Sequence, residues 1–297
     1  MRVFVVLFSV SVLGDEATEI PKSVRAKYKE CREMALTLSG REPTVFPWEN
    51  PTNENIIDLS WTYDANTIYW NETDAFELRI STTGTTSKDY EQKDHVSMAT
   101  SGGTHVGAPR MFHPKRWSVD QIPLRRLFNI PTVIIDVKKK VVKDRSYYLS
   151  VRDLQLWENA HGLLPNHSLI IIRTGHHMLY GNREGYFGHA ANRSRVFPTM
   201  GAKAARWLVR NRNIVGVGID SPSVDNLTTF LGHRALAKRN AYVIKNLASH
   251  IDQAPKRGTF AFVFPMKIGG ASAAPARVLL RVPHSRPKST TPNPAIS

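Results

Sequence analysis

Apolar residues form short continuous runs in the second half of the chain, separated by polar segments. The clearest runs span residues 132–137, 168–173 and 214–219. Uninterrupted apolar runs of this length are typical of strands in a sheet that is covered on both faces. Segments with helical spacing alternate with these strands, so the pattern predicts an α/β domain with a mixed sheet flanked by helices.

Further strands are expected at residues 55–61, 76–81, 241–244, 259–264 and 277–282. A helix is predicted from Ser150 to about Ala160, because Ser150 and Asp153 have the spacing of a capping box. We expect Thr199 to cap a second helix over 200–209 and a third helix over 230–238. A helix at 21–38 is predicted outside the sheet.

Domain organisation follows from these elements. A single domain over residues 55–283 is the simplest interpretation, preceded by an extension over 15–54 that holds the helix at 21–38. Residues 284–297 are rich in Pro, Ser, Thr and Lys, which is typical of a disordered tail.

The N-terminus has the pattern of a secretory signal peptide. Arg2 precedes an apolar run over residues 3–13, and the small residue Gly14 ends it. We therefore expect residues 1–14 to be removed and the protein to be secreted, although the run could also form a buried strand. The run is shorter than the roughly 20 residues that span a bilayer, and no other run is long enough.

Glycosylation sequons agree with an extracellular chain, whereas the cysteine content offers no disulfide to stabilise it. Asn71, Asn166, Asn192 and Asn226 each begin a glycosylation sequon. Cys31 is the single cysteine, so no intrachain disulfide can form, and we expect it to be buried or free.

The net charge is +15, which would attract acidic polymers. The basic residues are spread along the chain without interleaved aromatics, so a solvated basic surface is favoured over a dedicated partner. No specific nucleic-acid partner is expected.

Residues 101–113 read Ser-Gly-Gly-Thr-His-Val-Gly-Ala-Pro-Arg-Met-Phe-His. The glycines and the proline predict a tight loop in which backbone can approach a ligand closely. A lone histidine in such a loop is more often a hydrogen-bonded structural residue than a metal ligand, so the loop alone does not predict a metal site.

The same stretch resembles the metal-binding loop H-x-G-T-H-x-D-x-P-x-H of the cyclase family, which contains bacterial-type kynurenine formamidases and isatin hydrolases. Gly103-Thr104-His105 and Pro109 match it. Further matches in the family's order are Ile57-Asp58-Leu59-Ser60, the segments 121–124 and 133–137, Ile172-Arg173-Thr174-Gly175, the segment 216–225 with Asp220, Ser223 and Asp225, the run from His233 to Leu247, and the segment 265–270. Together they cover roughly residues 55–283.

The resemblance implies an α/β fold, a dimer or larger assembly, and a site for zinc or manganese that hydrolyses N-formylkynurenine in tryptophan catabolism, or a related cyclic amide. His105 and His233 stand at two of the family's five ligand positions. Ser101, Gly107 and Lys245 stand where the family has His, Asp and Glu. Met111 replaces the proton-shuttling histidine, and His113 is a possible substitute.

These replacements predict a weak metal site, and we expect no metal cofactor. A catalytic zinc site normally has three protein ligands, and a lysine ammonium would repel the metal. Lys245 could replace the lost cation in a ligand pocket with Thr104, His105 and His233, or it could have drifted and turned to solvent. The family-like residues Thr104, Pro109, Asp220, Ser223 and Asp225 are interpreted as turns and caps.

Three functions therefore stay open. The chain could be a pseudoenzyme that binds a small molecule, an active amidohydrolase with an altered site, or a basic extracellular binder of acidic polymers. The missing ligands favour the first function over the second, and the distributed charge disfavours the third.

Overall fold

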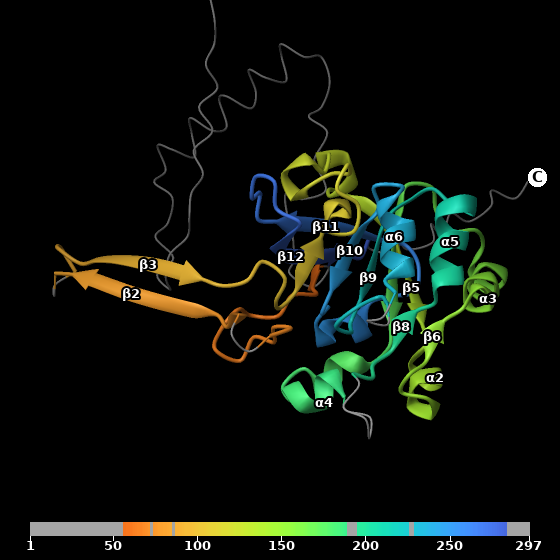
Figure 1. Ribbon diagram of the computed structural model, residues 1–297, viewed down its shortest axis with the longest axis horizontal. Coiled ribbons are helices and arrows are strands. Elements are labelled where there is room, and N and C mark those ends of the chain that lie inside the picture. The colour runs from red at the N-terminus through yellow and green to blue at the C-terminus, as the bar shows by residue number, and fades with distance from the viewer. Residues whose placement is uncertain (1–55, 72–73, 85–86, 189–194, 226–228, 284–297) are drawn as a thin grey trace, which may run out of the picture. The chain divides into compact units, whose positions relative to one another are not determined.

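A computed structural model describes residues 56–71, 74–84, 87–188, 195–225 and 229–283 (Figure 1). All of them belong to one unit that starts at Thr52. The predicted leader at 1–14, the helix at 21–38, Cys31 and the tail at 284–297 lie outside the described residues, as do Asn192 and Asn226.

The fold is an α/β domain built on a mixed sheet, as predicted. The order of strands in the sheet is β1-β12-β11-β5-β7-β9-β10-β4, and β4 also pairs with β12, which closes the sheet into a barrel-like arrangement. Strands β5, β7, β9 and β10 run parallel to one another. The strands are β1 (Ile56–Asp58), β4 (His105–Gly107), β5 (Ile130–Asp136), β7 (Ser168–Arg173), β9 (Ile214–Ile219), β10 (Tyr242–Lys245), β11 (Thr259–Pro265) and β12 (Ala273–Arg281).

The central strands are buried on both faces, which explains their continuous apolar runs. Every residue of β7 and β9 is buried. Successive side chains of a strand point to opposite faces, so Leu169 and Ile171 enter one core cluster while Ile170 and Ile172 enter another. The strands predicted at 168–173 and 214–219 are confirmed with the same bounds.

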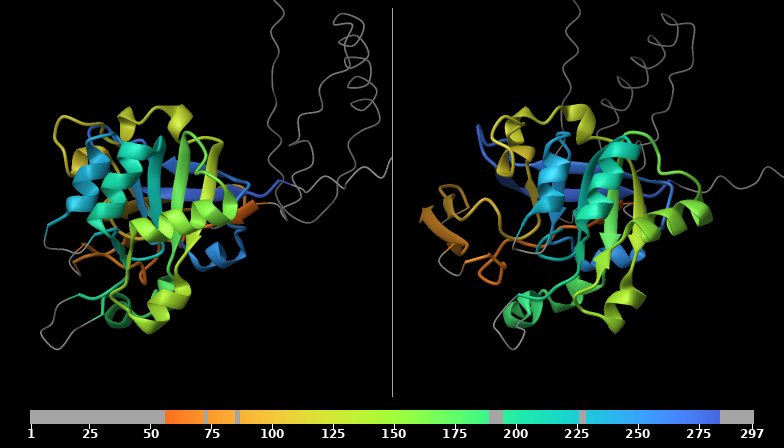
Figure 2. Two further views of the ribbon diagram at one scale, coloured as in Figure 1. Left: turned by 90° about the vertical axis from the view of Figure 1, so that its right-hand side faces the viewer. Right: turned by 45° about the vertical axis from the view of Figure 1, so that its right-hand side comes forward.

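Helices cover one face of these strands. Figure 2 shows α3 (Val151–His161), α5 (Ala202–Asn211) and α6 (Leu231–Ala237) along that face. The predicted capping box of α3 is confirmed, because the Asp153 backbone N–H donates to Ser150 Oγ (3.3 Å) and the Ser150 N–H donates to Asp153 Oδ2 (2.7 Å). The remaining helices are α2 (Lys138–Lys143), α4 (Arg183–Phe187) and the 3-10 helices η3 (Pro109–Met111), η4 (Val119–Gln121), η5 (Leu124–Arg126), η6 (His176–Leu179) and η7 (Ser249–Gln253).

Two local predictions were wrong. Thr199 does not cap a helix: Thr199–Met200 forms strand β8, which pairs with β6 (Tyr148–Leu149), and α5 follows Gly201. The predicted loop contains strand β4, whose three residues are all buried. In both cases pairing with strands distant in sequence decides the local conformation, and no local pattern signals it.

Strands β2 (Glu77–Thr83) and β3 (Glu91–Ser97) form a hairpin that is exposed along its whole length. It stands out from the closed sheet in Figure 1. Over the described ranges, no helix has the length and apolar character needed to cross a membrane.

Candidate functional site

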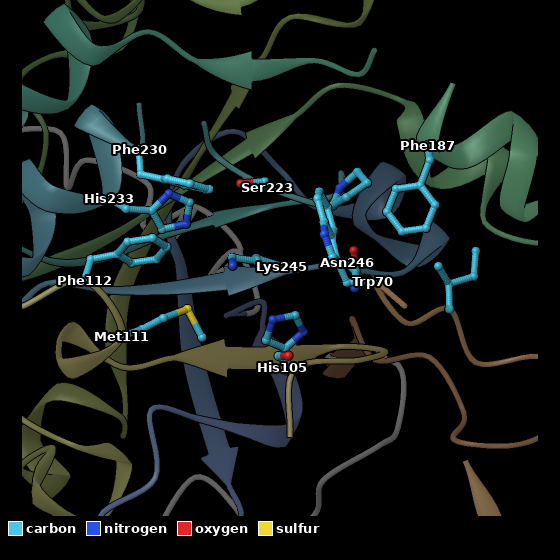
Figure 3. Close-up of a pocket in the computed structure, with 13 residues that line it drawn as sticks. Trp70, His105, Met111, Phe112, Phe187, Ser223, Phe230, His233, Lys245 and Asn246 are labelled. Carbon is cyan, nitrogen blue, oxygen red and sulfur yellow. The ribbon is translucent and has the colours of Figure 1, made fainter. Parts of the chain in front are cut away.

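A pocket of about 220 Å³ lies where strands β9 and β10 end. Ligands of α/β folds, both open and closed, commonly bind at the carboxyl ends of the parallel strands. Five of the positions that correspond to the family's metal ligands and proton shuttle line this pocket together: Ser101, His105, Met111, His233 and Lys245. Figure 3 shows the Lys245 side chain between the two imidazole rings.

Antiparallel pairing between β4 and β10 sets the floor of the pocket, because it places His105 opposite Lys245. Two glycines precede β4, and each lies against an aromatic ring. A Cβ on Gly102 would lie 2.0 Å from the Tyr69 ring, and Gly103 has φ +51° with the Tyr63 ring 2.7 Å from the place of a Cβ. The glycines of the predicted loop therefore make room for aromatic rings behind the site.

His105 has an unprotonated ring nitrogen without a hydrogen-bond partner among the described residues. Its ring Nδ1 lies 3.0 Å from the Gly103 carbonyl oxygen, which can only accept, so Nδ1 carries the proton. Nε2 is then an unprotonated acceptor, and it has no hydrogen-bond partner among the described residues. Burial, together with the Lys245 charge, lowers the pKa of His105 to about 3 and keeps the ring neutral.

His233 has the same tautomer for a different reason. Its Nδ1 donates to Asp225 Oδ2 at 2.8 Å, and its Nε2 has no partner within the described part of the chain. Asp225 also accepts from the backbone N–H groups of Gly232 and His233, so it orients the ring as well as forming a turn. Burial lowers the pKa of His233 to about 4.

Lys245 is buried in the pocket with a side chain that pairs with no described residue. Only 8% of it is exposed, so it is not turned to solvent. Burial lowers the pKa of its ammonium group to about 8, and the Asp225 carboxylate opposes that change. The site therefore combines one cation with two neutral acceptors.

The donors at this site do not fit the family's metal. Ser101 is exposed, and Lys245 would repel a dication. A Cβ on Gly107 would lie 3.6 Å from the Met111 sulfur, so the thioether packs beside the position of the missing carboxylate. Among the described residues, no group of three or more His, Cys, Asp or Glu side chains could hold a metal ion.

Aromatic side chains that the sequence did not predict form the pocket walls: Trp70, Phe112, Phe187 and Phe230. The Phe112 ring lies tilted against the His233 ring, with centroids 4.2 Å apart. The Arg195 guanidinium lies 3.9 Å from the centre of the Trp70 ring, which is a cation–π contact with this wall residue. These residues come from separate segments, so no local sequence pattern connects them.

The other candidate residues lie elsewhere. Thr104 does not line the pocket: its buried hydroxyl accepts from the Trp61 N–H (2.9 Å) and donates to the Asn246 carbonyl (2.8 Å). His113 also does not line it. Asn71 and Asn166, which begin two of the sequons, are both exposed.

Of the residues that were interpreted as turns and caps, some line the pocket and others lie outside it. Asp220 is fully buried, where it accepts from Thr174 and from the His177 ring, whereas Ser223 contributes to the pocket wall. Pro109 is buried at the start of η3.

Known proteins with similar sequences are hydrolases. The chain is 27% identical over 191 residues to an isatin hydrolase from Roseibium aggregatum, which covers 61% of this chain and 71% of the relative. It is 25% identical over 199 residues to a kynurenine formamidase from Paracidovorax citrulli, covering 63% and 79%.

Solved structures and a family pattern agree with these relatives. Isatin hydrolase A from Ralstonia solanacearum superposes with a TM-score of 0.68 at 23% identity, over 90% of this chain and all of that one. Residues 57–226 match the Cyclase family, described as "Putative cyclase". This match covers more than half of the chain, which therefore belongs to the cyclase family.

Proposed function

We propose that this chain is a secreted cyclase-family protein that binds a small aromatic anion where its relatives are expected to hold a metal, and that it has lost the family's hydrolytic activity. The observation that carries the proposal is the position of Lys245, buried between two imidazoles with no partner among the described residues. A desolvated ammonium attracts anions far more strongly than an exposed one does.

The hydrogen-bond donors and acceptors of the pocket limit which chemical groups a ligand can carry. The bare Nε2 atoms of His105 and His233 accept hydrogen bonds, while Lys245 donates them. A matching ligand brings a carboxylate to the ammonium and N–H or O–H groups to the imidazoles. The rings of Trp70, Phe112, Phe187 and Phe230 favour an aromatic body.

Loss of hydrolysis follows from the same groups. Activation of water at neutral pH needs either a metal or a base whose pKa lies near the working pH. The donors present do not suit a metal, and the lowered pKa values of His105 and His233 make both rings weak bases. The hydrolase relatives support an origin in this chemistry. The proposed loss rests on the residues that replace the family's ligands, Ser101, Gly107 and Lys245.

Secretion is supported by the sequence of residues 1–14 and by the exposure of Asn71 and Asn166. Protein recovered from the medium of a cell that expresses the full chain should lack the leader and lose mass on treatment with a glycosidase. Retention of Met1 together with an unchanged mass would refute this part of the proposal.

The binding proposal is tested by titration calorimetry with 2-aminobenzoate, which carries both a carboxylate and N–H donors. We expect saturable binding, which weakens at least about tenfold in Lys245→Met because a charge-assisted contact is removed. Lys267→Met is the matched control, since Lys267 is exposed and lies outside the pocket.

Two results would overturn the proposal. One is equal binding of 2-aminobenzoate by Lys245→Met and Lys267→Met. The other is steady turnover of N-formylkynurenine by the purified chain, which would show that hydrolysis persists.

A further inference from the structure

A second cavity, of about 460 Å³, lies at the opposite ends of the central strands. Ile214, which begins β9, lines it, whereas the first pocket lies where β9 and β10 end. Four arginines line this cavity: Arg126, Arg210, Arg212 and Arg239. No acidic side chain is among its described lining residues.

Arg126 is fixed in place without an acidic partner. Its Nη2 donates to the carbonyl oxygens of Ile214, Val215 and Asn240 at 3.1–3.3 Å, and its guanidinium lies 5.5 Å from the centre of the Trp117 ring. Its Nε is buried and has no hydrogen-bond partner among the described residues. The guanidinium is thus held rigidly while its charge is met only by dipoles and an aromatic face.

The other three arginines divide into two kinds. Arg212 is neutralised by Glu158, with contacts of 2.5 and 2.6 Å, and it lies 4.6 Å from the centre of the Trp207 ring. Arg210 and Arg239 are exposed, and neither forms an ion pair with a described residue. Three of the four positive charges around the cavity are therefore uncompensated.

We propose that this cavity is a binding site for a tetrahedral oxyanion, a phosphate or sulfate group, separate from the aromatic pocket. Arg126 supplies a fixed charge, and Arg210 and Arg239 are free to turn toward the anion. Guanidinium groups match the geometry of such oxygens and bind them through paired N–H groups. Asn211 and Asn213, which also line the cavity, offer further N–H donors.

The cavity has room for more than the bare ion. Its volume falls within the range of roughly 300–1,000 Å³ that is typical of small-molecule sites. The oxyanion could be free, or it could be borne by a larger molecule such as a sulfated polysaccharide. Both sources share the chemistry that the arginines recognise, and experiment separates them.

The test is titration calorimetry of the full chain with inorganic phosphate and, in a second series, with dextran sulfate, at constant ionic strength set by chloride. We expect saturable binding that weakens about tenfold in Arg239→Gln and in Arg210→Gln, since each loses a charge-assisted contact. Arg152→Gln removes the same charge from an exposed position on α3 and should bind as the parent does.

Binding of phosphate that depends on Arg210 and Arg239 assigns a free anion to the cavity. Binding of dextran sulfate alone, with the same dependence, assigns an anion borne by a polymer. The proposal fails if neither probe binds with saturation, or if Arg152→Gln weakens binding as much as Arg239→Gln does, because the attraction would then come from the net charge of +15.

Discussion

Lys245 is a residue whose burial costs stability. A buried ammonium without an ion-pair partner loses hydration, and this desolvation lowers the pKa of Lys245 although the Asp225 carboxylate opposes the change. Neutral drift at an unused site would readily replace such a group by an apolar one. A residue that destabilises the free protein, yet lines a pocket with matching acceptors, is more simply explained by a ligand that compensates its charge.

Lys245→Met should therefore stabilise the free protein while weakening the binding of anions. The shift in the Lys245 pKa from 10.5 to about 8 corresponds to a gain of up to about 3 kcal/mol in the free energy of unfolding at pH 7. The unfolded chain holds the proton between pH 8 and 10.5 and the folded chain does not, so the wild type recovers stability as the pH rises through this window. Urea unfolding should show that the variant exceeds the wild type in the free energy of unfolding at pH 7, and that this difference is smaller at pH 10. A variant that is less stable than the wild type at pH 7 would contradict this account.

Because His105 is neutral in the fold, it gives the free energy of unfolding a second pH dependence, in which stability is lost as the pH falls. Its pKa is 6.5 when unperturbed and about 3 in the fold, so the unfolded chain gains a proton first as the pH falls below 6.5. The wild type should lose about 2 kcal/mol more than His105→Gln between pH 7 and pH 5, as measured by urea unfolding. Parallel losses in the two proteins would show that His105 is charged in the fold.

At the level of elements, local patterns predicted the strands whose residues are buried on both faces. Residues 168–173 and 214–219 were identified with their observed bounds, because a continuous apolar run is itself the signature of such a strand. The start of α5 and the strand β4 were missed, because pairing with distant strands fixes both of them. The positions of His105, His233 and Lys245 followed from family resemblance, whereas the aromatic walls had no signal in the sequence.

The connection into β4 depends on two glycines, and the change Gly102→Ala tests this. The added Cβ would lie 2.0 Å from the Tyr69 ring, so we expect a loss of about 1–3 kcal/mol in the free energy of unfolding from overpacking. Gly269→Ala is the control, because nothing lies within 4 Å of the place of its Cβ. Thermal unfolding compares the two variants, and equal midpoints would contradict the tight packing that we describe behind the site.

For the whole molecule, closure of the sheet is what assembles the site. Strand β4 pairs with both β10 and β12, so the chain around His105 is held from two sides and is placed opposite Lys245. This frame does not depend on the identity of the metal ligands. The fold of the family can therefore persist while the chemistry of its pocket changes from metal binding to a fixed ammonium.

The same frame should accept the family's ligands again. A Cβ at position 107 would meet only ordinary contacts, the nearest being the Met111 sulfur at 3.6 Å. Replacing Met111 at the same time removes the side chain that a carboxylate at 107 would displace. We expect the combined variant Ser101→His, Gly107→Asp, Met111→His and Lys245→Glu to fold and to regain a metal site.

Zinc binding of the wild type and of this fourfold variant, measured in competition with a chromophoric chelator, tests the exchange of metal for ammonium most directly. The account predicts no stoichiometric zinc in the wild type and about one tightly held ion per chain in the variant. One equivalent of tightly bound zinc in the wild type would contradict it.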